Sequence, residues 1–445
     1  MRFAARRSVP ALLLSLCALV VAAIVVTPVA HAQRSTEVQQ PTQGQRTEPT
    51  TPQQSAQCQN HDRPPPPIDT SEEPKPGEPT PPPLAVPEEP VGGTRMGECG
   101  LVHPEGAAEL PGGVTSASWV ISNIDSGAVI AAKDPHARER PASLIKVLLA
   151  IVVIRELRPD KTVSGTQADA DQEGTKVGVG PGGEYTVKQL LQALVMRSGN
   201  DAAHALAVQL GGVPEALAKM NTLAKELGAL DTRAATPSGL DGPGMSTSSY
   251  DLSLIFRAAM KHKEFAEAVA TRSIDFPGYG KKPGYKVTND NPLLRTYEGF
   301  IGGKTGFTDD ARHTYLGSAK RGDVRLAVVL LRGERNPAPL ADQAAELLDY
   351  GFAVAKSSAK PMGQLVDHAP EVQPKPDSNR GGSTTGESGG DDAAPAPVAD
   401  TQRSAFGNYG APLVIVAGAG VLVAFALWIR SKRARAARAA RSALM

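Results

Sequence analysis

The sequence predicts a mixed α+β domain, with an antiparallel sheet flanked by helices and a second lobe that is mostly helical. Strand-like segments open and close this region, at 118–123, 128–132, 299–307, 314–319 and 324–331. Asp125-Ser126-Gly127 suits a hairpin turn between the first two. Helical signals fill the middle. We therefore expect the early hairpin and the late strands to share one sheet, with a cleft between the sheet and the helical lobe.

The helices of the middle region are predicted from the spacing of their apolar residues, at 187–196, 201–210, 214–227, 250–262 and 265–271. Thr186 precedes the first of them and can cap it. A helix at 342–354 closes the domain, and the Gly-rich, polar stretch 165–183 is expected to be a loop. An earlier helix is predicted to begin near Pro141, and it is apolar on nearly every face from Leu144 onward.

Both flanks of the domain, which we place at 100–356, have a different composition. Residues 1–32 resemble a secretory signal peptide, because arginines precede an apolar run that ends in Ala30-His31-Ala32. Residues 33–99 are rich in Pro, Gln, Thr and Glu, and residues 357–408 in Gly, Ser, Pro, Asp and Ala. Neither composition supplies enough apolar surface to fold, so both segments are predicted to be disordered linkers.

The apolar run at 410–430 is long enough to span a bilayer, and the basic tail at 431–445 marks its cytoplasmic end. The domain is therefore expected outside the cytoplasm, tethered to the membrane by its C-terminus. A net charge of +1 gives no indication of a nucleic-acid partner. Cys58 and Cys99 remain after signal removal, and they either pair or stay free. Neither has the neighbours that a metal site requires.

Ser143 and Lys146 are the first candidates for catalysis. Their spacing places both side chains on one helix face, and Lys146 is the one charge in an apolar run. A desolvated lysine loses its proton readily and can act as a general base for a serine nucleophile. The alternative is a solvated lysine beside a capping serine. The same spacing recurs at Ser357 and Lys360 in the predicted linker.

Two further motifs lie at positions that would face the same cleft. Ser198-Gly199-Asn200 joins two predicted helices, and its hydroxyl and amide can relay a proton or hold a carbonyl, although such residues also cap helices. Lys304-Thr305-Gly306 lies in a strand-like run, where a cation and a hydroxyl can bind a carboxylate. Gly306 leaves room for a peptide to add to the edge. The alternative is a solvated strand lysine before a turn.

Together and in this order, the three motifs resemble those of penicillin-binding proteins and class A β-lactamases. The chain resembles the D-alanyl-D-alanine carboxypeptidases, the low-molecular-mass penicillin-binding proteins of serine peptidase family S11, over roughly residues 113–352. The stretches 236–242 and 247–252 also resemble a loop and a helix of this family. The signal, anchor and linkers look like those of actinobacterial members.

The resemblance implies a β-lactamase/transpeptidase-like fold, no cofactor, and hydrolysis of the bond between the last two D-alanines of peptidoglycan stem peptides. It implies that Ser143 is the nucleophile, that Lys146 is the base and that Ser198 assists proton transfer. It further implies that Asn200, Lys304, Thr305 and Gly306 bind the substrate. β-Lactams are then expected to acylate Ser143 and inhibit the enzyme.

The chain departs from the family pattern after the third motif, where Arg312 stands in place of the usual glycine. This substitution puts the local strand geometry in question. We also predict that no β-rich stalk follows the catalytic domain. The remaining alternatives are a β-lactamase, a DD-transpeptidase or endopeptidase of the same fold, and a non-catalytic peptidoglycan-binding protein.

Overall fold

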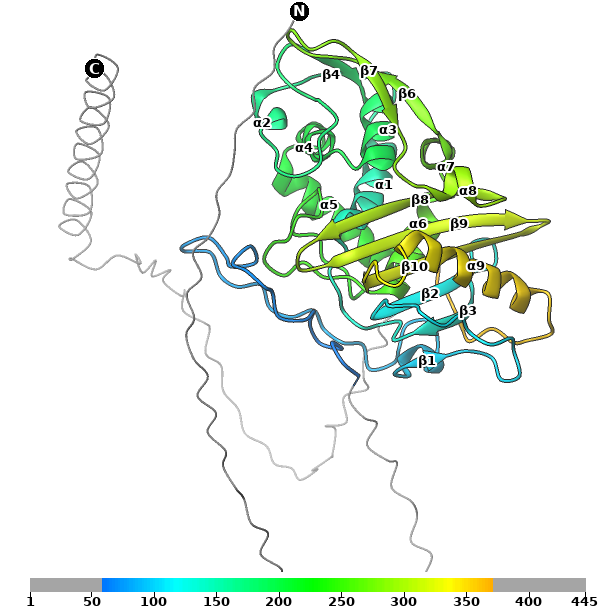
Figure 1. Cartoon of the computed structure of the whole chain (residues 1–445). Coiled ribbons are helices and arrows are strands. Elements are labelled where there is room, and N and C mark those ends of the chain that lie inside the picture. Colours follow the sequence, from blue (N-terminus) through cyan, green and yellow to red (C-terminus); the bar gives the residue numbers. More distant parts are fainter. Residues whose placement is uncertain (1–57, 371–445) are drawn as a thin grey trace, which may run out of the picture. The chain divides into compact units, whose positions relative to one another are not determined.

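A seven-stranded antiparallel sheet forms the centre of the molecule in the computed structural model, which describes residues 58–370 (Figure 1). The strand order is β1-β3-β2-β10-β9-β8, and β11 pairs with β3. The strands are β1 (Leu101–Val102), β2 (Ser118–Asn123), β3 (Ala128–Lys133), β8 (Phe300–Thr308), β9 (Arg312–Arg321), β10 (Val324–Gly333) and β11 (Gly363–Gln364). The early hairpin thus joins the late strands in one sheet, as the sequence predicted.

Strand β2 connects the two halves of the sheet, because it pairs with β10 from Ser118–Leu331 to Asn123–Leu326. Successive side chains of a strand point to opposite faces. Val120 and Val329 accordingly join the core beneath the helical lobe, whereas Ile121 and Val328 join the core beneath α9 (Leu340–Ala355). The sheet is therefore buried on both faces, and this explains the unbroken apolar runs Trp119–Ile121 in β2 and Leu326–Leu331 in β10.

The helical lobe covers the other face of the sheet (Figure 1). Its helices are α1 (Lys146–Glu156), α2 (Gln167–Ala170), α3 (Val187–Arg197), α4 (Asn200–Gln209), α5 (Val213–Glu226), α6 (Ser249–Ala259) and α7 (Lys263–Ala270). The short helix α8 (Leu293–Thr296) instead places Leu293 in the core beneath α9. The five helices predicted in this region are confirmed within a few residues. Thr186 caps α3 as expected, since its hydroxyl accepts the Gln189 N–H at 3.1 Å.

Two small hairpins of this lobe were not predicted from the sequence. They pair β4 (Thr162–Ser164) with β5 (Glu184–Thr186), and β6 (Ser273–Phe276) with β7 (Tyr285–Thr288). Each strand has only three or four residues, which is too short for an alternating pattern to stand out. Helix α2 likewise interrupts the stretch 165–183 that was expected to be a loop.

The helix predicted to begin near Pro141 starts differently. A 3₁₀ turn, η2 (Ala142–Ile145), precedes α1, and Ala142 has a φ of +47°. A right-handed α-helix cannot include a residue with positive φ, so the α-helix starts only at Lys146. From Lys146 to Val153, every side chain of α1 is buried, which confirms the prediction of a helix that is apolar on all faces.

The prediction of a disordered linker at 33–99 is wrong for residues 58–99, which we call the strap. The strap lies along the catalytic domain and ends in the short helix η1 (Thr94–Gly97). The Arg138 guanidinium donates hydrogen bonds to the carbonyl oxygens of Asp62, Leu84 and Ala85, at 2.6, 2.7 and 2.9 Å. Bonds from a buried arginine to backbone carbonyls thus hold a segment that has almost no apolar core of its own.

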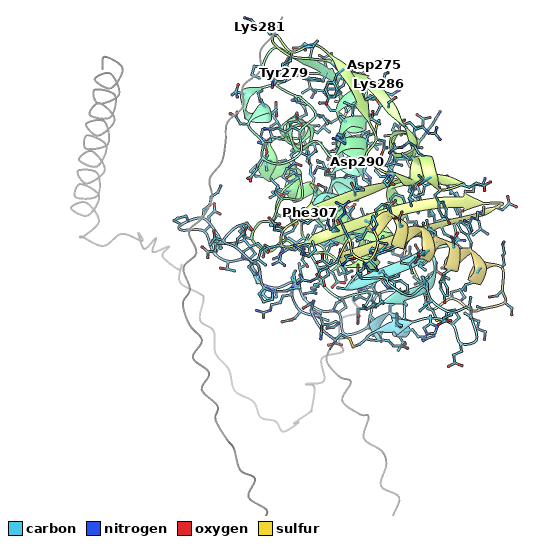
Figure 2. The ribbon with its side chains drawn as sticks, viewed as in Figure 1. Asp275, Tyr279, Lys281, Lys286, Asp290 and Phe307 are labelled. Carbon is cyan, nitrogen blue, oxygen red and sulfur yellow. A yellow bond between two sulfur atoms is a disulfide. The ribbon has the colours of Figure 1, made fainter. Side chains whose placement is uncertain are left out.

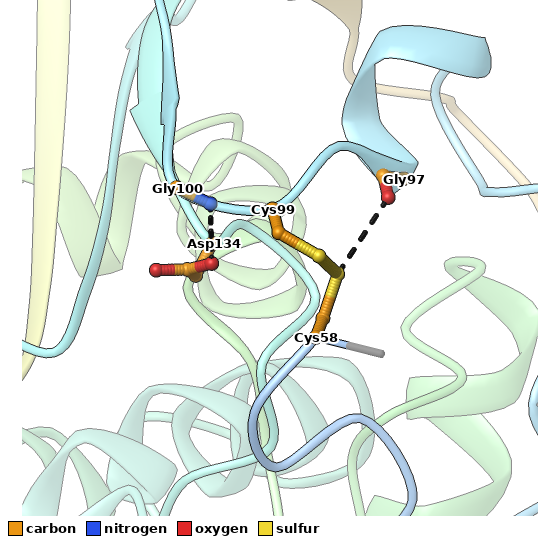
Figure 3. The surroundings of a disulfide bond; sticks show 5 residues. All are labelled: Cys58, Gly97, Cys99, Gly100 and Asp134. Carbon is orange, nitrogen blue, oxygen red and sulfur yellow. Dashed lines mark hydrogen bonds between the residues drawn. A yellow bond between two sulfur atoms is a disulfide. The ribbon is translucent and has the colours of Figure 1, made fainter. Parts of the chain in front are cut away.

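A disulfide between Cys58 and Cys99 joins the two ends of the strap (Figure 3). The two Cα atoms are 5.3 Å apart, and 41 positions separate the cysteines in the sequence. Beside it, the Gly100 N–H donates to Asp134 Oδ1 at 2.6 Å and fixes the strap where it enters the domain (Figure 3). The question that the sequence left open is settled in favour of pairing.

The C-terminal boundary predicted at 356 is also wrong, because ordered structure continues to residue 370. Gly363 of β11 pairs with Val129, and the hydroxyl of Tyr250 donates to the Gln364 carbonyl at 2.7 Å. Backbone pairing with β3 explains why a segment of linker-like composition is held here. The predicted signal peptide, residues 33–57, the rest of the second linker, the apolar run 410–430 and the basic tail lie outside the described residues. Within residues 58–370, no helix has the length and apolar character needed to cross a bilayer.

Candidate active site

Ser143 and Lys146 meet where the 3₁₀ turn passes into α1. Nζ of Lys146 lies 2.8 Å from Oγ of Ser143 and 2.8 Å from Oδ1 of Asn200, and it also contacts the carbonyl oxygen of Ser238. The Lys146 side chain is fully buried, whereas Ser143 remains partly exposed. A hydroxyl that substrate can reach is therefore in hydrogen-bond contact with an amine that solvent cannot reach.

Burial lowers the pKa of Lys146 well below its ordinary value, because a desolvated ammonium is unfavourable. The positive charge of Lys304 lowers this pKa further, whereas the carboxylates of Asp201 and Asp290 oppose the shift. The environment therefore favours the neutral amine, which is the form that can accept a proton from the Ser143 hydroxyl.

The loop 236–242 packs directly against the turn that carries Ser143. Gly239 has a φ of +84°, and a Cβ at this position would lie 1.9 Å from the carbonyl oxygen of Ala142. Only glycine permits this approach. The Thr236 hydroxyl accepts the Gly239 N–H at 3.0 Å and donates to the Leu240 carbonyl at 2.8 Å, which fixes the loop. The residues of this loop resemble those of the family, but the sequence alone predicted no role for them.

The second motif lies between α3 and α4. Ser198 adopts the left-handed conformation, with a φ of +65°, and this ends α3 and turns the chain into α4. Asn200 begins α4, donates its Nδ2 to the Glu173 carbonyl at 2.7 Å and offers Oδ1 to Lys146. Asn200 therefore positions the lysine. The Ser198 hydroxyl is buried and has no hydrogen-bond partner among residues 58–370, so the structure does not place it in contact with Ser143.

Asp201 is a site residue that the sequence analysis missed. Its buried carboxylate accepts the N–H groups of Val177, Gly178 and Val179 at 2.7–3.0 Å. These bonds fasten the loop before β5 to the start of α4, next to Asn200. Asp201 is adjacent to the second motif, but its position in the first turn of a helix made it look like an ordinary capping acid.

The third motif lies on β8, the last strand in the sheet order. Lys304 is buried, and burial lowers its pKa to about 8 while the Asp290 carboxylate opposes the shift. Thr305 and Gly306 are partly exposed. A Cβ on Gly306 would lie 3.0 Å from the backbone nitrogen of Ser143, so glycine lets the strand approach the nucleophile. The backbone of β8 thus brings the motif Lys304–Gly306 next to the turn that carries Ser143.

Arg312 follows the turn between β8 and β9 with a φ of +56°, a conformation that glycine adopts most easily. Its guanidinium pairs with the Glu334 carboxylate at 2.9 Å, and it lies 6.0 Å from the centre of the Phe307 ring. Pairing of β8 with β9 is nevertheless regular from Gly302 to Thr308. Arginine at this position therefore preserves the strand geometry that the sequence had put in question.

Two groups of side chains could hold a metal by their donor atoms, His136–Asp231–Asp251 and Glu72–Asp241–Asp310. In the first, His136 bonds Asp231 at 2.7 Å and the Val91 carbonyl at 3.0 Å, so both ring nitrogens have protein partners. In the second, Glu72 pairs with Arg140, and Asp310 accepts the Ile68 N–H at 2.6 Å. Both groups serve to hold the strap.

The fold and the site together define a serine enzyme that transfers acyl groups, with a buried lysine in contact with the serine and, among residues 58–370, an edge of β8 that has no partner strand. The sheet, the helical lobe and the Ser-x-x-Lys turn are those of the penicillin-binding, DD-peptidase class.

Comparison with known proteins identifies the family. A family profile described as D-alanyl-D-alanine carboxypeptidase, peptidase family S11, matches residues 105–335, more than half of the chain. The chain belongs to this family. It is 46% identical over 258 residues to the D-alanyl-D-alanine carboxypeptidase DacB2 of Mycobacterium tuberculosis, which covers 57% of this chain and 87% of the relative. It is 31% identical to DacF of Bacillus subtilis over 53% of this chain, but that match covers only 62% of the relative.

Solved structures agree with this assignment. A D-alanyl-D-alanine carboxypeptidase from Mycobacterium tuberculosis superposes with a TM-score of 0.56 and 44% identity, over 59% of this chain and all of the other. A DD-transpeptidase from Streptomyces superposes with a TM-score of 0.52 and 28% identity, over 55% of this chain and all of the other. The predicted β-lactamase/transpeptidase-like fold is confirmed.

Proposed function

We propose that this protein is a serine-type carboxypeptidase that removes the terminal D-alanine from peptidoglycan stem pentapeptides. One observation carries the proposal: the buried, desolvated amine of Lys146 touches the hydroxyl of Ser143 beside a free strand edge. Membership of the D-alanyl-D-alanine carboxypeptidase family supports the substrate class.

Acylation begins when neutral Lys146 takes the Ser143 proton and Oγ attacks the carbonyl carbon between the two D-alanines. The backbone nitrogen of Ser143 lies close to Gly306 of β8, and its N–H is the donor that we propose stabilises the oxyanion of the tetrahedral intermediate. Asn200 and the Ser238 carbonyl hold the amine in place during the transfer. The lysine then returns its proton to the departing amino group of D-alanine.

The substrate binds as an added strand on the outer edge of β8, which has no partner strand among residues 58–370. Its terminal carboxylate lies near Lys304 and Thr305, and its scissile carbonyl lies near Gly306 and Ser143. Protonated Lys304 supplies the positive charge for the carboxylate. The Ser198 hydroxyl, which is buried and has no hydrogen-bond partner among residues 58–370, is the group of the second motif that we propose relays protons.

Water then hydrolyses the acyl-enzyme, with the same lysine as base, and releases the shortened peptide. A β-lactam offers a carbonyl and a carboxylate in a similar arrangement, so it acylates Ser143. Its leaving group stays attached to the acyl-enzyme, and this slows the attack of water. Inhibition by β-lactams follows.

We further propose that the domain works outside the cytoplasm, held to the membrane by the segment 410–430. The predicted signal peptide and the basic tail support this placement, as does the Cys58–Cys99 disulfide, since disulfides persist in oxidising compartments. Fractionation of cells, with protease treatment of intact spheroplasts, tests it. Cleavage of the domain is expected, and its protection would contradict the proposal.

The activity is tested with the full chain in detergent, a stem pentapeptide and mass spectrometry. Loss of one alanine is expected, and Ser143→Ala should abolish both this loss and covalent labelling by a fluorescent penicillin. Ser357→Ala is the matched control, because Ser357 has the same spacing to a lysine but lies at the exposed end of α9. Release of alanine by Ser143→Ala would show that Ser143 is not the nucleophile.

A second reaction, transfer to an amine instead of water, is favoured by the similarity to a DD-transpeptidase structure. The same experiment with added glycylglycine distinguishes the two. A transpeptidase would give a product heavier than the hydrolysed tetrapeptide by the mass of the acceptor less water.

A further inference from the structure

The strap reaches the catalytic domain at one particular place. The backbone N–H of Ile68 donates to Asp310 Oδ1 at 2.6 Å, in the turn between β8 and β9. Four residues later, Glu72 pairs with the buried Arg140, with Nη2 at 2.8 Å from Oε2. Carboxylate oxygens of Glu72, Asp241 and Asp310 lie within 4.8 Å of one another. The strap, the loop 236–242 and the β8–β9 turn therefore meet at one point.

In the binding mode proposed above, this point lies at the end of the path that the substrate follows along β8. A peptide that adds antiparallel to β8, with its carboxylate at Lys304 and Thr305, passes Ser143 near Gly306. Its upstream residues must then continue past Phe307 towards the β8–β9 turn. The Thr308 hydroxyl donates to Asp241 Oδ1 at 3.0 Å, and this joins β8 to the loop 236–242 at the same end.

Two large apolar side chains flank this end and remain open to solvent. Ile68 is 69% exposed and Phe307 is 47% exposed. Figure 2 shows Phe307 near the end of the sheet that faces the strap. Alternation along β8 puts Phe307 on the same face as Thr305, two residues before it. Exposed apolar groups at both sides of a cleft exit provide surface for an apolar part of a ligand.

We propose that the strap forms the distal wall of the substrate cleft, where Ile68 and Phe307 contact aliphatic parts of the peptide residues upstream of the D-Ala-D-Ala pair. The inference rests on the proposed function and deepens it. The substrate class is a peptide that extends at least two residues upstream of this pair. A substrate without those residues does not reach the wall.

Glu72 acts as a positioning residue in this arrangement. Its ion pair with Arg140 holds the tip of the strap, and Arg140 lies three residues before Ser143 in the chain. The strap tip is thereby fixed relative to the nucleophile. Glu73, the adjacent residue, is exposed and its side chain makes no hydrogen bond or ion pair among residues 58–370, so it offers a matched comparison.

The test measures kcat and KM of the full chain in detergent with a stem pentapeptide. It also measures the rate at which 6-aminopenicillanic acid, a β-lactam with no upstream acyl group, acylates Ser143. Ile68→Ala is expected to lower kcat/KM for the pentapeptide about fivefold through KM, because the lost contact is apolar and partial. Acylation by 6-aminopenicillanic acid should not change. Val86→Ala, an exposed apolar residue elsewhere on the strap, should change neither.

Glu72→Gln should raise KM for the pentapeptide by a similar factor, whereas Glu73→Gln should leave it unchanged. The wall is overturned if Ile68→Ala leaves KM unchanged, if Val86→Ala raises KM equally, or if Ile68→Ala slows both reactions alike. Failure of the unsubstituted chain to be acylated by 6-aminopenicillanic acid is a different result, because it would overturn the proposed function and the wall with it.

Discussion

The cleft and the strap are held in place by different physical means. Around the cleft, buried apolar packing fixes α1 and the sheet, and burial changes the chemistry of Lys146 and Lys304. The strap buries few apolar side chains; besides His136, arginines and a disulfide hold it at separate points. Apolar packing lowers the pKa values of the two lysines, whereas hydrogen bonds, an ion pair and a disulfide at separate points position the strap.

The two regions share one segment of the chain. Residues 136–140 provide His136, Arg138 and Arg140, which bind the strap, and Ser143 follows three residues later. Arg138 also pairs with buried Asp231 at 3.0 Å. The segment that anchors the strap therefore leads directly into the nucleophile turn. Variants that affect only one of the two regions sharpen the comparison.

The largest effect is expected in the cleft. Lys146→Met should lower the acylation rate at least about a thousandfold, because it removes the general base. The rate of labelling by a fluorescent penicillin measures it. Lys360→Met is the matched control, since Lys360 has the same spacing to a serine but is exposed, and it should label at the normal rate. Labelling of Lys146→Met at the normal rate would show that acylation does not require the Lys146 amine.

Where the domain binds the strap, Arg138→Met should lower the free energy of unfolding by about 3 kcal/mol. Asp231 loses a buried partner, and three carbonyl groups of the strap lose their hydrogen-bond donor. Denaturant unfolding measures this change. Arg63→Met removes an exposed arginine of the strap and should alter stability by no more than about 0.5 kcal/mol. Equal losses in both variants would mean that the strap is not held by Arg138.

Reduction of the disulfide should lower the free energy of unfolding by about 2–4 kcal/mol. The bond closes a loop over a sequence separation of 41, and the unfolded chain gains conformational entropy when this loop is opened. Thermal unfolding with and without a reductant measures it. The double variant Cys58→Ser/Cys99→Ser should match the reduced protein and should not respond to the reductant. Its acylation by 6-aminopenicillanic acid should be normal, and a marked loss would show that the strap also supports the cleft.

The pH dependence should give the smallest effect. The pKa of Lys304 is lowered to about 8, so its charge is lost as pH rises through that value. Because the charged form binds the substrate carboxylate, kcat/KM should fall above pH 8, by up to tenfold per pH unit. Lys304→Arg keeps its charge and should shift this fall in kcat/KM to higher pH. If the fall stays at the same pH in Lys304→Arg, it arises from the titration of another group.

The same shift has a consequence for stability. The pKa of Lys304 in the folded protein lies below its ordinary value of 10.5, so between about 8 and 10.5 the unfolded chain binds a proton that the folded protein does not. Lys304 therefore disfavours the folded state progressively as pH falls through this window. Lys304→Met should remove that part of the pH dependence.

The sequence predicted the strands β2, β3, β8, β9 and β10 from short strand-like runs and a turn signal, and the main helices from apolar residues that repeat with the period of a helix. It did not predict β4 to β7, which are short, or the ordered strap. Proline-rich segments carry no such period. The strap is held by arginines at 138 and 140, far along the chain, and composition does not reveal such partners.

The sequence by itself determined which reactive groups exist and in what order: Ser143, Lys146, the Ser198–Asn200 motif and the Lys304–Gly306 motif. Only the tertiary structure decided that the Ser238 carbonyl completes the lysine site, that Gly239 and Gly306 let backbone approach the nucleophile, and that the strap is bonded to the turn between β8 and β9. The physical reason is that the identity of a residue determines the chemistry of its side chain. Any residue can supply a backbone carbonyl, so the path of the chain selects which carbonyl reaches Lys146 and which glycines meet the backbone beside Ser143.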